Sequence, residues 1–334
     1  MKITYERGID HCQPMLYVKE VTISTIEPAV NSDFLDKITF VEIGWNAISK
    51  RGLHKPGQRV MFIPPESVLP YELGEALEIT KYLSKGRVRV TKLRGNRSEG
   101  LIVNSEKIEP YIPYIMKWED LPSVQMQGEM ISPSEISIDF CKFYQMPNIL
   151  NEPNIFEYGE KIIYSEKIHG TNTRCGCLIN PVTEEYQIYI GSHNIVLKES
   201  EKNIYWRVVK EKLADRLPRD ITMFGEIFGR GIQHLHYDKS LPDILLFAAS
   251  RRGDYMPNSA FLRMCEQYNL PHVKFHTTRF ESIEQMRELA DGPSELTSSH
   301  MREGIVVTSA FYPERMAKCL GFNYLTSKKK TERH

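Results

Sequence analysis

One segment of this 334-residue chain places a lysine, a carboxylate and an imidazole close enough together to do chemistry: Ser165-Glu-Lys-Ile-His-Gly-Thr-Asn-Thr-Arg174. It follows an apolar run, Ile162–Tyr164, that predicts a strand. A lysine at a strand end can attack a nucleotide α-phosphate once its amine is deprotonated, and burial and nearby cations lower a lysine pKa. Gly170 would let the backbone pass close to the nucleotide. Alone, however, a lysine three residues before a glycine fits a surface lysine before a turn better.

Three further segments downstream favour the interpretation of Lys167 as a nucleophile. They are Met223-Phe-Gly-Glu-Ile-Phe-Gly229, Arg302-Glu-Gly-Ile-Val-Val307 and Lys318. Together with Glu166-Lys-Ile-His-Gly-Thr-Asn172 they resemble the motifs of the covalent nucleotidyltransferase superfamily, and the first motif is similar to that of its RNA ligases. The resemblance implies that ATP adenylates Lys167, that the AMP moves to an RNA 5′-phosphate, and that a 3′-hydroxyl then displaces it. ATP and Mg²⁺ or Mn²⁺ are the implied cofactors, and RNA with 3′-hydroxyl and 5′-phosphate ends is the implied partner.

The resemblance also implies roles for individual residues. A carboxylate at Glu226 would bind ribose or metal, one at Glu303 would serve the metal or the reacting phosphates, and Lys318 would contact the α-phosphate. The candidate catalytic residues are Lys167, Glu166, His169, Asn172 and Lys318. The candidate nucleotide-binding residues are Lys167, Gly170, Arg174, Glu226, Phe247, Glu303 and Lys318, and the candidate metal ligands are Glu226, Glu303 and Glu166.

Four of these residues have an alternative interpretation. Glu226 also fits an edge-strand carboxylate, and Glu303 also fits a surface ion pair with Arg302. Lys318 also fits a solvated helix lysine. Phe247 fits strand core as well as a ring stacked on adenine.

Two histidines, His234 and His236, invite a metal interpretation. The sequence places no third ligand beside them. Loop or core histidines are therefore the preferred interpretation.

The motifs also depart from the family pattern. His193, in Gly191-Ser-His-Asn194, stands where the family carries an arginine, and Lys198 is a substitute for it. Leu246-Phe-Ala-Ala-Ser250 lacks the family's aspartate, and position 320 is Leu where a second lysine is expected. Lys328 to Lys330 could supply that charge or form a solvated basic terminus.

The expected fold class is α+β: an N-terminal OB-like β-barrel followed by an ATP-grasp-like nucleotidyltransferase domain of antiparallel sheets with flanking helices. We predict an OB-like RNA-binding module at 1–104, a connecting segment at 105–150 and an adenylyltransferase domain at 151–334. An OB-like module before the catalytic domain resembles the Deinococcus- and Naegleria-type RNA ligases. The predicted N-terminal elements are strands at Met15–Ile26, Phe40–Trp45, Arg59–Ile63, Arg87–Leu93 and Gly100–Val103, and a helix at Glu72–Tyr82. The predicted C-terminal elements are strands at Ile162–Ile168, Tyr186–Gly191, Ile221–Phe228, Ile244–Ala249 and Gly304–Thr308, and helices at Asn203–Arg216, Ser259–Tyr268 and Ser282–Asp291.

Basic residues gather near the end of the N-terminal module. Arg87 and Arg89 alternate along a predicted strand and would project on one face. OB-folds commonly bind nucleic acid through such a face. The predicted RNA-binding residues are Arg87, Arg89, Lys92, Arg94 and Arg97. A solvated strand face is the alternative, because the formal net charge of the chain is +0.

Composition narrows the setting. The six cysteines form no C-x-x-C pair, which argues against a disulfide framework and a zinc ribbon. The N-terminus carries charges where a signal peptide is apolar, and no apolar run is long enough for a membrane span. We expect a soluble cytoplasmic or nuclear monomer. Its alternatives in function are a GTP-dependent guanylyltransferase and a nucleic-acid-binding module with a degenerate transferase site.

Overall fold

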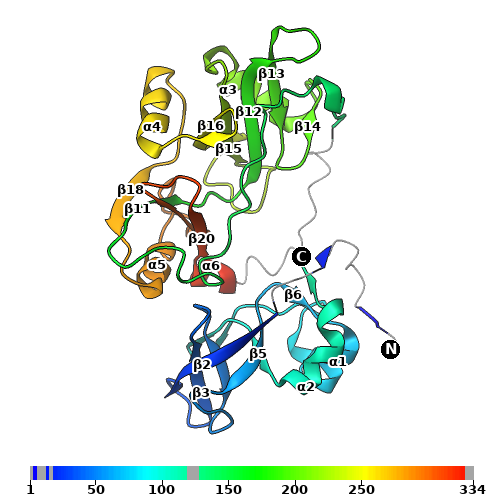
Figure 1. The fold of residues 1–334 in the computed structure, drawn as a ribbon, viewed down its shortest axis with the longest axis vertical. Coiled ribbons are helices and arrows are strands. Elements are labelled where there is room, and N and C mark those ends of the chain that lie inside the picture. Colours follow the sequence, from blue (N-terminus) through cyan, green and yellow to red (C-terminus); the bar gives the residue numbers. More distant parts are fainter. Residues whose placement is uncertain (1–2, 6–12, 15–17, 119–127, 328–334) are drawn as a thin grey trace. The chain divides into compact units, whose positions relative to one another are not determined.

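The computed structural model describes residues 3–5, 13–14, 18–118 and 128–327. The chain divides into two compact units, each a mixture of helices and antiparallel sheets (Figure 1). Unit 1 comprises Met1–Leu121, Ile149–Pro153 and Leu325–His334, and unit 2 comprises Pro122–Asn148 and Asn154–Tyr324. The predicted connecting segment is therefore shared between the two units, because its prolines and aromatic residues pack with different cores.

Unit 1 is built on a five-stranded antiparallel sheet in the order β4-β3-β2-β5-β9. Its edge strands β4 and β9 contact each other, so the sheet nearly closes on itself. Val21 and Ile23 alternate inward along β2, as a half-buried strand requires. The elements are β1 (Gln13–Pro14), β2 (Lys19–Pro28), β3 (Leu35–Phe40), β4 (Ala47–Lys50), β5 (Arg59–Ile63), β6 (Ser67–Val68), α1 (Tyr71–Ala76), η1 (Thr80–Tyr82), β7 (Thr91–Leu93), β8 (Asn96–Ser98), β9 (Leu101–Val103), α2 (Ser105–Ile108), η2 (Glu109–Tyr114) and β10 (Met116–Lys117).

Two N-terminal strand predictions were wrong in position. The strand expected at Phe40–Trp45 is mostly loop, because β3 ends at Phe40 and the Gly44 N–H donates to the Leu150 carbonyl instead of joining a sheet. The strand expected at Arg87–Leu93 contains only Thr91–Leu93. The predicted helix at 72–82 also breaks, since Glu78 adopts a left-handed backbone (φ 58°) between α1 and η1.

Unit 2 contains two antiparallel sheets, a six-stranded one in the order β14-β13-β12-β15-β16-β17 and a four-stranded one in the order β18-β11-β19-β20. Helices α3 and α4 cover the six-stranded sheet, and α5 packs on β19 and β20 (Figure 1). The elements are η4 (Pro133–Glu135), β11 (Lys161–Glu166), β12 (Thr171–Ile179), β13 (Tyr186–Gly191), β14 (Val196–Leu197), α3 (Ile204–Lys212), η5 (Ala214–Arg216), β15 (Thr222–Phe228), β16 (Asp243–Arg251), β17 (Asp254–Tyr255), α4 (Asn258–Gln267), β18 (Phe275–Arg279), α5 (Ile283–Ala290), β19 (Gly304–Ser309), β20 (Met316–Leu320) and α6 (Phe322–Thr326).

Two helices of unit 2, α3 and α5, begin at side-chain caps. Asn203 caps α3 by accepting from the N–H groups of Tyr205 and Trp206. Ser282 caps α5 by accepting from the Gln285 N–H, as the capping pattern predicted. The Gln285 side chain returns to the Glu281 N–H, one residue earlier than in the standard capping box.

Register between the strands positions the motif residues. Strand β11 ends at Glu166, one residue before Lys167, whose N–H donates to the Gly304 carbonyl at the start of β19. The chain then crosses to the six-stranded sheet, where β12 pairs Asn172 with Glu226 of β15. A turn of four residues thus joins the two sheets, and the residues on it can reach carboxylates from both.

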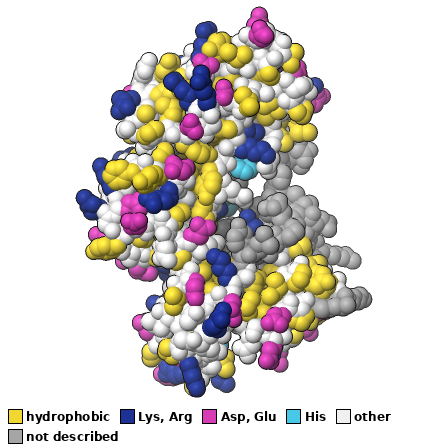
Figure 2. Space-filling model, in the orientation of Figure 1, with side chains coloured by type: hydrophobic (Ala, Val, Ile, Leu, Met, Phe, Trp, Pro, Cys, Tyr) yellow, Lys and Arg dark blue, Asp and Glu magenta, His cyan; other side chains and the backbone are white. Residues whose placement is uncertain are grey.

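Positive and negative side chains are mixed on one face of the molecule (Figure 2). Lys and Arg side chains are interspersed with Asp and Glu over the face drawn in Figure 2, in keeping with the zero net charge. Among the described residues, no helix is both long and apolar enough to cross a membrane.

Candidate active site

The lysine of the first motif lies in a network of buried polar groups. Lys167 Nζ is 2.8 Å from Glu303 Oε1, and His169 Nδ1 is 2.8 Å from the other oxygen, Oε2. His169 Nε2 is 3.1 Å from His234 Nδ1, and the His169 N–H donates to the Tyr237 hydroxyl (2.7 Å). An ionised carboxylate only accepts, so His169 donates from Nδ1, and in its neutral form Nε2 accepts from His234. Glu303 therefore holds Lys167 and His169 in one arrangement.

The protonation states of this network differ from the expectation for a nucleophilic lysine. Burial alone lowers the pKa of Lys167, but the charges of Glu303 and Glu226 outweigh it, and the pKa is raised above its ordinary value. Burial alone raises the pKa of Glu303, but Lys167 and His169 hold it well below its usual range. The expectation of a lowered Lys167 pKa was therefore wrong for the protein without nucleotide or metal, because the neighbouring charges are carboxylates. About a quarter of the Lys167 side chain is exposed, so a nucleotide can reach it.

Glu226 is the second carboxylate near Lys167. Burial raises its pKa to about 8; Lys167 opposes the rise and Glu303 adds to it. The edge-strand interpretation of Glu226 was wrong, since β15 lies between β12 and β16 in the middle of its sheet. When Glu226 ionises, two carboxylates share one lysine, and a divalent cation would neutralise the excess negative charge.

Replacing Glu226 by glutamine is expected to stabilise the protein in a pH-dependent way. An ordinary carboxyl has a pKa of 4.5, so below that value both folded and unfolded protein are protonated. As the pH rises toward 8, only the unfolded protein releases this proton readily, and the wild type loses stability that Glu226→Gln retains. We expect the variant to gain about 2 kcal/mol in free energy of unfolding at pH 8.5, and little at pH 4.5, by urea denaturation in EDTA. The exposed Glu314→Gln is the control, and an equal change at both pH values would contradict the assignment.

Gly170 permits a close approach of backbone to backbone. A Cβ at this position would lie 2.2 Å from the Ile227 carbonyl oxygen and 3.0 Å from Glu226 Cγ. No side chain fits there without moving the turn that carries Lys167 away from β15. This is the physical reason for the glycine, which the sequence suggested only as a point of approach to the nucleotide.

Substituting alanine at Gly170 is expected to damage stability and activity together. Overpacking of this kind costs typically about 1–3 kcal/mol of unfolding free energy, and a displacement of about 1 Å can cost on the order of 10²-fold in rate. Thermal unfolding and single-turnover adenylation measure the two effects. Gly231→Ala, where the added Cβ meets nothing within 4 Å although φ is 86°, is the comparison for backbone strain alone. Equal adenylation rates in the two variants would contradict the packing argument.

The residues around Lys167 fit a divalent cation. Within the described part of the chain, Glu166 Oε1 and Asn172 Oδ1 are buried without a hydrogen-bond partner. Glu226 stands directly opposite Asn172, and the other oxygen of Glu166 accepts from the Glu295 N–H (2.6 Å). Oxygen ligands are what Mg²⁺ and Mn²⁺ prefer. Glu226, Glu303 and Asn172 therefore offer a suitable donor set, with Glu166 directed toward the neighbouring loop.

Lys318 lies on a strand, not on the helix that its alternative interpretation required. It occupies β20 opposite Val306, which in turn pairs with Ser165 of β11. Paired residues share a sheet face, and Lys167 is two positions beyond Ser165. The register thus places Lys318 on the face from which Lys167 projects.

Phe247 is displaced from the regular ladder. Strand β15 shifts register between Phe224 and Gly225, which pair with Ala248 and Leu246. Phe247 is the extra residue of this β-bulge. Its partly buried ring packs edge-on against Phe143, with centroids 4.9 Å apart. Bulges re-aim side chains beside active sites, which is compatible with a stacking role and with packing.

The Arg174 side chain is held by hydrogen bonds and ring contact with other groups of the protein. Its Nη1 donates to the Phe140 carbonyl (3.0 Å), its Nε donates to the Ser192 carbonyl (3.1 Å), and its guanidinium lies over the Phe140 ring. Burial, together with the positive charges of Lys142 and Arg174, lowers the pKa of His193. Lys142 thus brings the positive charge that sequence reasoning sought at Lys198, which instead pairs with Glu129 (3.2 Å). Lys328 to Lys330 lie outside the described residues.

Sequence reasoning missed the aromatic and imidazole residues around His169. His234 was assigned to a loop or core, and neither Tyr237 nor Tyr324 was considered. The Tyr324 hydroxyl is 3.1 Å from His169 Nδ1. No local pattern marks these residues, because they meet only through the tertiary fold.

Arg87 and Arg89 of the predicted RNA-binding face do not lie on a strand, whereas Lys92 and Arg97 face each other on β7 and β8. Arg87 is buried, forms an ion pair with Glu66 and stacks over the Trp118 ring. It therefore stabilises unit 1, and its assignment to an exposed RNA-binding face was wrong. Lys92 and Arg94, on the β7–β8 hairpin, are exposed, and Arg89 and Arg97 are half-buried.

Antiparallel sheets here bring a strand-end lysine beside two carboxylates, which is the arrangement that the motif resemblance to the covalent nucleotidyltransferases implies. Residues 160–320 match the model of the RNA ligase family. The resemblance seen in the motifs is thereby confirmed. No curated protein matches the chain significantly in sequence.

The fold is shared with Naegleria gruberi RNA ligase. Its structure with PPi has a TM-score of 0.80 and 22% sequence identity, over 96% of this chain and 100% of that chain. A mutant of the same protein with ATP and Mn has a TM-score of 0.79 and 22% identity, over 95% and 99% of the two chains.

Proposed function

We propose that the chain is an ATP-dependent RNA ligase that joins a 3′-hydroxyl to a 5′-phosphate through a lysyl-AMP and an RNA-adenylate. The observation that carries this proposal is the position of Lys167, 2.8 Å from Glu303 and beside Glu226, inside the segment that matches the model of the RNA ligase family. The Naegleria structures with ATP and Mn support the choice of nucleotide and cation.

The first step forms the bond between Lys167 Nζ and the α-phosphorus of ATP while the bond to pyrophosphate breaks. Glu303 orients Nζ for this attack, and Lys318 opposes charge on the α-phosphate oxygens. Bound Mg²⁺ or Mn²⁺ supplies positive charge that stabilises the phosphate oxygens. Glu226, Glu303 and Asn172 would hold it. Once their charge is balanced, only burial acts on Lys167, and its pKa falls toward the value that a nucleophile needs.

The two later steps need no second ATP: the first transfers AMP to the RNA and the second releases it. The RNA 5′-phosphate oxygen attacks the lysyl-AMP phosphorus and the phosphorus–nitrogen bond breaks. The RNA 3′-oxygen then attacks the activated 5′-phosphate, AMP leaves, and the 3′-hydroxyl proton is released. His169, fixed by Glu303 and by His234, is placed to position groups in these steps.

Unit 1 is the proposed RNA-binding module. Its nearly closed five-stranded sheet, whose last strand β9 ends at Val103, supports an OB-like fold within the proposed module at 1–104. The proposed catalytic domain begins at about residue 151. Lys92 and Arg94 on the exposed β7–β8 hairpin are the side chains best placed for RNA phosphates. The protein acts as a monomer.

Incubation with labelled nucleotides and nicked duplexes tests the proposal. The wild type is expected to take label from α-labelled ATP but not GTP, and to seal nicks with RNA at the 3′-hydroxyl side. Labelling by GTP alone would indicate a guanylyltransferase. Absence of any covalent adduct, with retained RNA binding, would indicate a degenerate binding module.

A further inference from the structure

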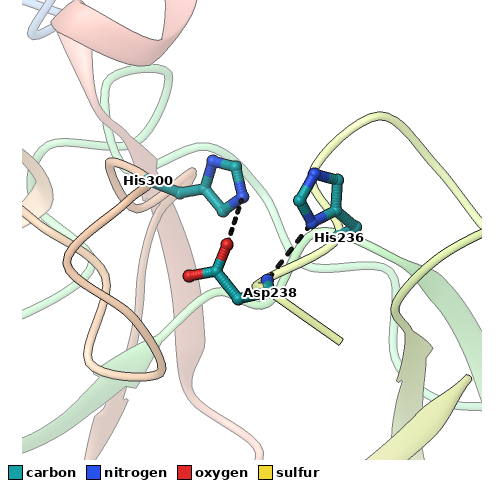
Figure 3. Close-up of side chains that lie close together, drawn as sticks. All are labelled: His236, Asp238 and His300. Carbon is teal, nitrogen blue, oxygen red and sulfur yellow. Dashed lines mark hydrogen bonds and ion pairs between the residues drawn. The ribbon is translucent and has the colours of Figure 1, made fainter. Parts of the chain in front are cut away.

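A second cluster of potential ligands lies outside the lysine network. His236 and Asp238 come from the loop between β15 and β16, and His300 comes from the loop before β19 (Figure 3). One ligand atom from each residue lies within 4.8 Å of the other two. Asp238 Oδ1 is 4.0 Å from His300 Nε2, and the Asp238 N–H donates to His236 Nδ1 (3.2 Å). His234 is not part of this cluster, and Asp238 and His300 supply the two ligands beside His236.

The donor set indicates the kind of ion. Two imidazoles and one carboxylate suit Zn²⁺ and neighbouring transition metals, whereas Mg²⁺ and Ca²⁺ prefer oxygen alone. His236 Nδ1 uses its lone pair to accept the Asp238 N–H, so Nε2 is the nitrogen left for a metal, which would displace its proton. Ligand atoms around tetrahedral zinc lie roughly 3.4 Å apart. Small rotations of the exposed His236 and Asp238 side chains would close the cluster to that spacing.

Neighbouring groups already orient the carboxylate. The Thr297 hydroxyl donates to Asp238 Oδ2, and the Ser299 N–H donates to the Thr297 hydroxyl. Such outer hydrogen bonds fix ligand orientation in metal sites. In the loop that carries His236, the ligand Asp238 and the preceding Tyr237 both adopt left-handed backbone conformations (φ 56° and 51°). Two consecutive non-glycine residues there are strained, and such strain gathers where a ligand is held.

We propose that His236, Asp238 and His300 form a transition-metal site, best suited to Zn²⁺, with a fourth position for water. This site differs from the site proposed for the nucleotide-associated cation, because neither Glu226 nor Glu303 is among its ligands. Its consequence is structural. One loop carries His234 and Tyr237, which hold His169, and the other continues into Glu303. An ion joining the loops therefore orders both sides of the His169 network; only the consequence for ligation rests on the proposed function.

Zinc binding tests the site without any activity measurement. Tag-free protein in millimolar Mg²⁺ is titrated with Zn²⁺ by calorimetry, and bound metal is quantified after dialysis. We expect one Zn²⁺ per chain in the wild type, and binding on the order of 100-fold weaker in His236→Gln and Asp238→Asn. His54→Gln, at a histidine outside the cluster, is the matched control. Absence of saturable binding, or equal binding in the variants, would overturn the proposal.

Two further measurements guard against misfolding and test the structural consequence. Co²⁺ in the wild type should give the intense visible absorption of a four-coordinate site, which Asp238→Asn should lose while keeping the wild-type circular dichroism. Zn²⁺ should slow amide exchange in peptides covering 231–240 and the His169 N–H, by at least about threefold in wild type only. Unchanged exchange with bound Zn²⁺ would overturn the ordering role.

Discussion

Replacing Lys167 by arginine is expected to reduce formation of the enzyme–AMP intermediate by on the order of 10⁴-fold or more, while leaving the fold intact. Arginine keeps the positive charge that Glu303 and Glu226 require, so no buried carboxylate loses its partner. Its guanidinium does not deprotonate in proteins, however, and cannot act as the nucleophile. The change therefore separates the chemical role of the side chain from its electrostatic role.

The measurement is intact-protein mass after incubation with ATP and Mg²⁺, together with thermal unfolding. Lys161→Arg, an exposed lysine at the other end of β11, is the control and should be adenylated as the wild type is. Adenylation of Lys167→Arg at a rate close to that of the wild type would exclude Lys167 as the nucleophile. Lys167→Ala is the less informative variant, because it also removes the positive charge beside Glu303 and Glu226.

Glu303→Gln is expected to lower the rate of adenylation on the order of 10²–10³-fold and to shift its pH dependence. Glu303 contributes one oxygen to Lys167 and the other to His169, so both side chains lose their orientation together. It is also a cause of the raised Lys167 pKa. Removal of its charge lowers that pKa, so the remaining rate should reach its plateau at lower pH than in the wild type.

Single-turnover adenylation from pH 5.5 to 9.5 at saturating ATP measures both effects. Glu314→Gln, an exposed carboxylate on the turn before β20, should retain the wild-type rate and profile. A surface ion pair with Arg302, the alternative interpretation of Glu303, predicts almost no change in either quantity. A shift of the profile to higher pH would contradict the sign of the electrostatic coupling.

The site around Lys167 shows how much of the structure local sequence patterns can predict. The order and spacing of the motifs located Lys167, Glu226, Glu303 and Lys318, and apolar runs predicted the strands that carry or precede most of them. Strands β5 and β13 have the predicted bounds, because alternation and turn residues act within a few positions. The strand β20 that carries Lys318 was missed, since a five-residue strand with one exposed edge leaves little periodic signal.

The sequence by itself determined which residues are the candidates for the chemistry, because their types and order are local properties of the chain. Only the tertiary structure decided their states and partners. Register brought His169 to Glu303 across 134 positions and gave Lys167 carboxylate neighbours that raise its pKa. The same non-local packing buried Arg87, placed Phe247 on a bulge and brought His300 to His236. Pairing between distant strands and loops depends on the whole core, so no short segment can reveal it.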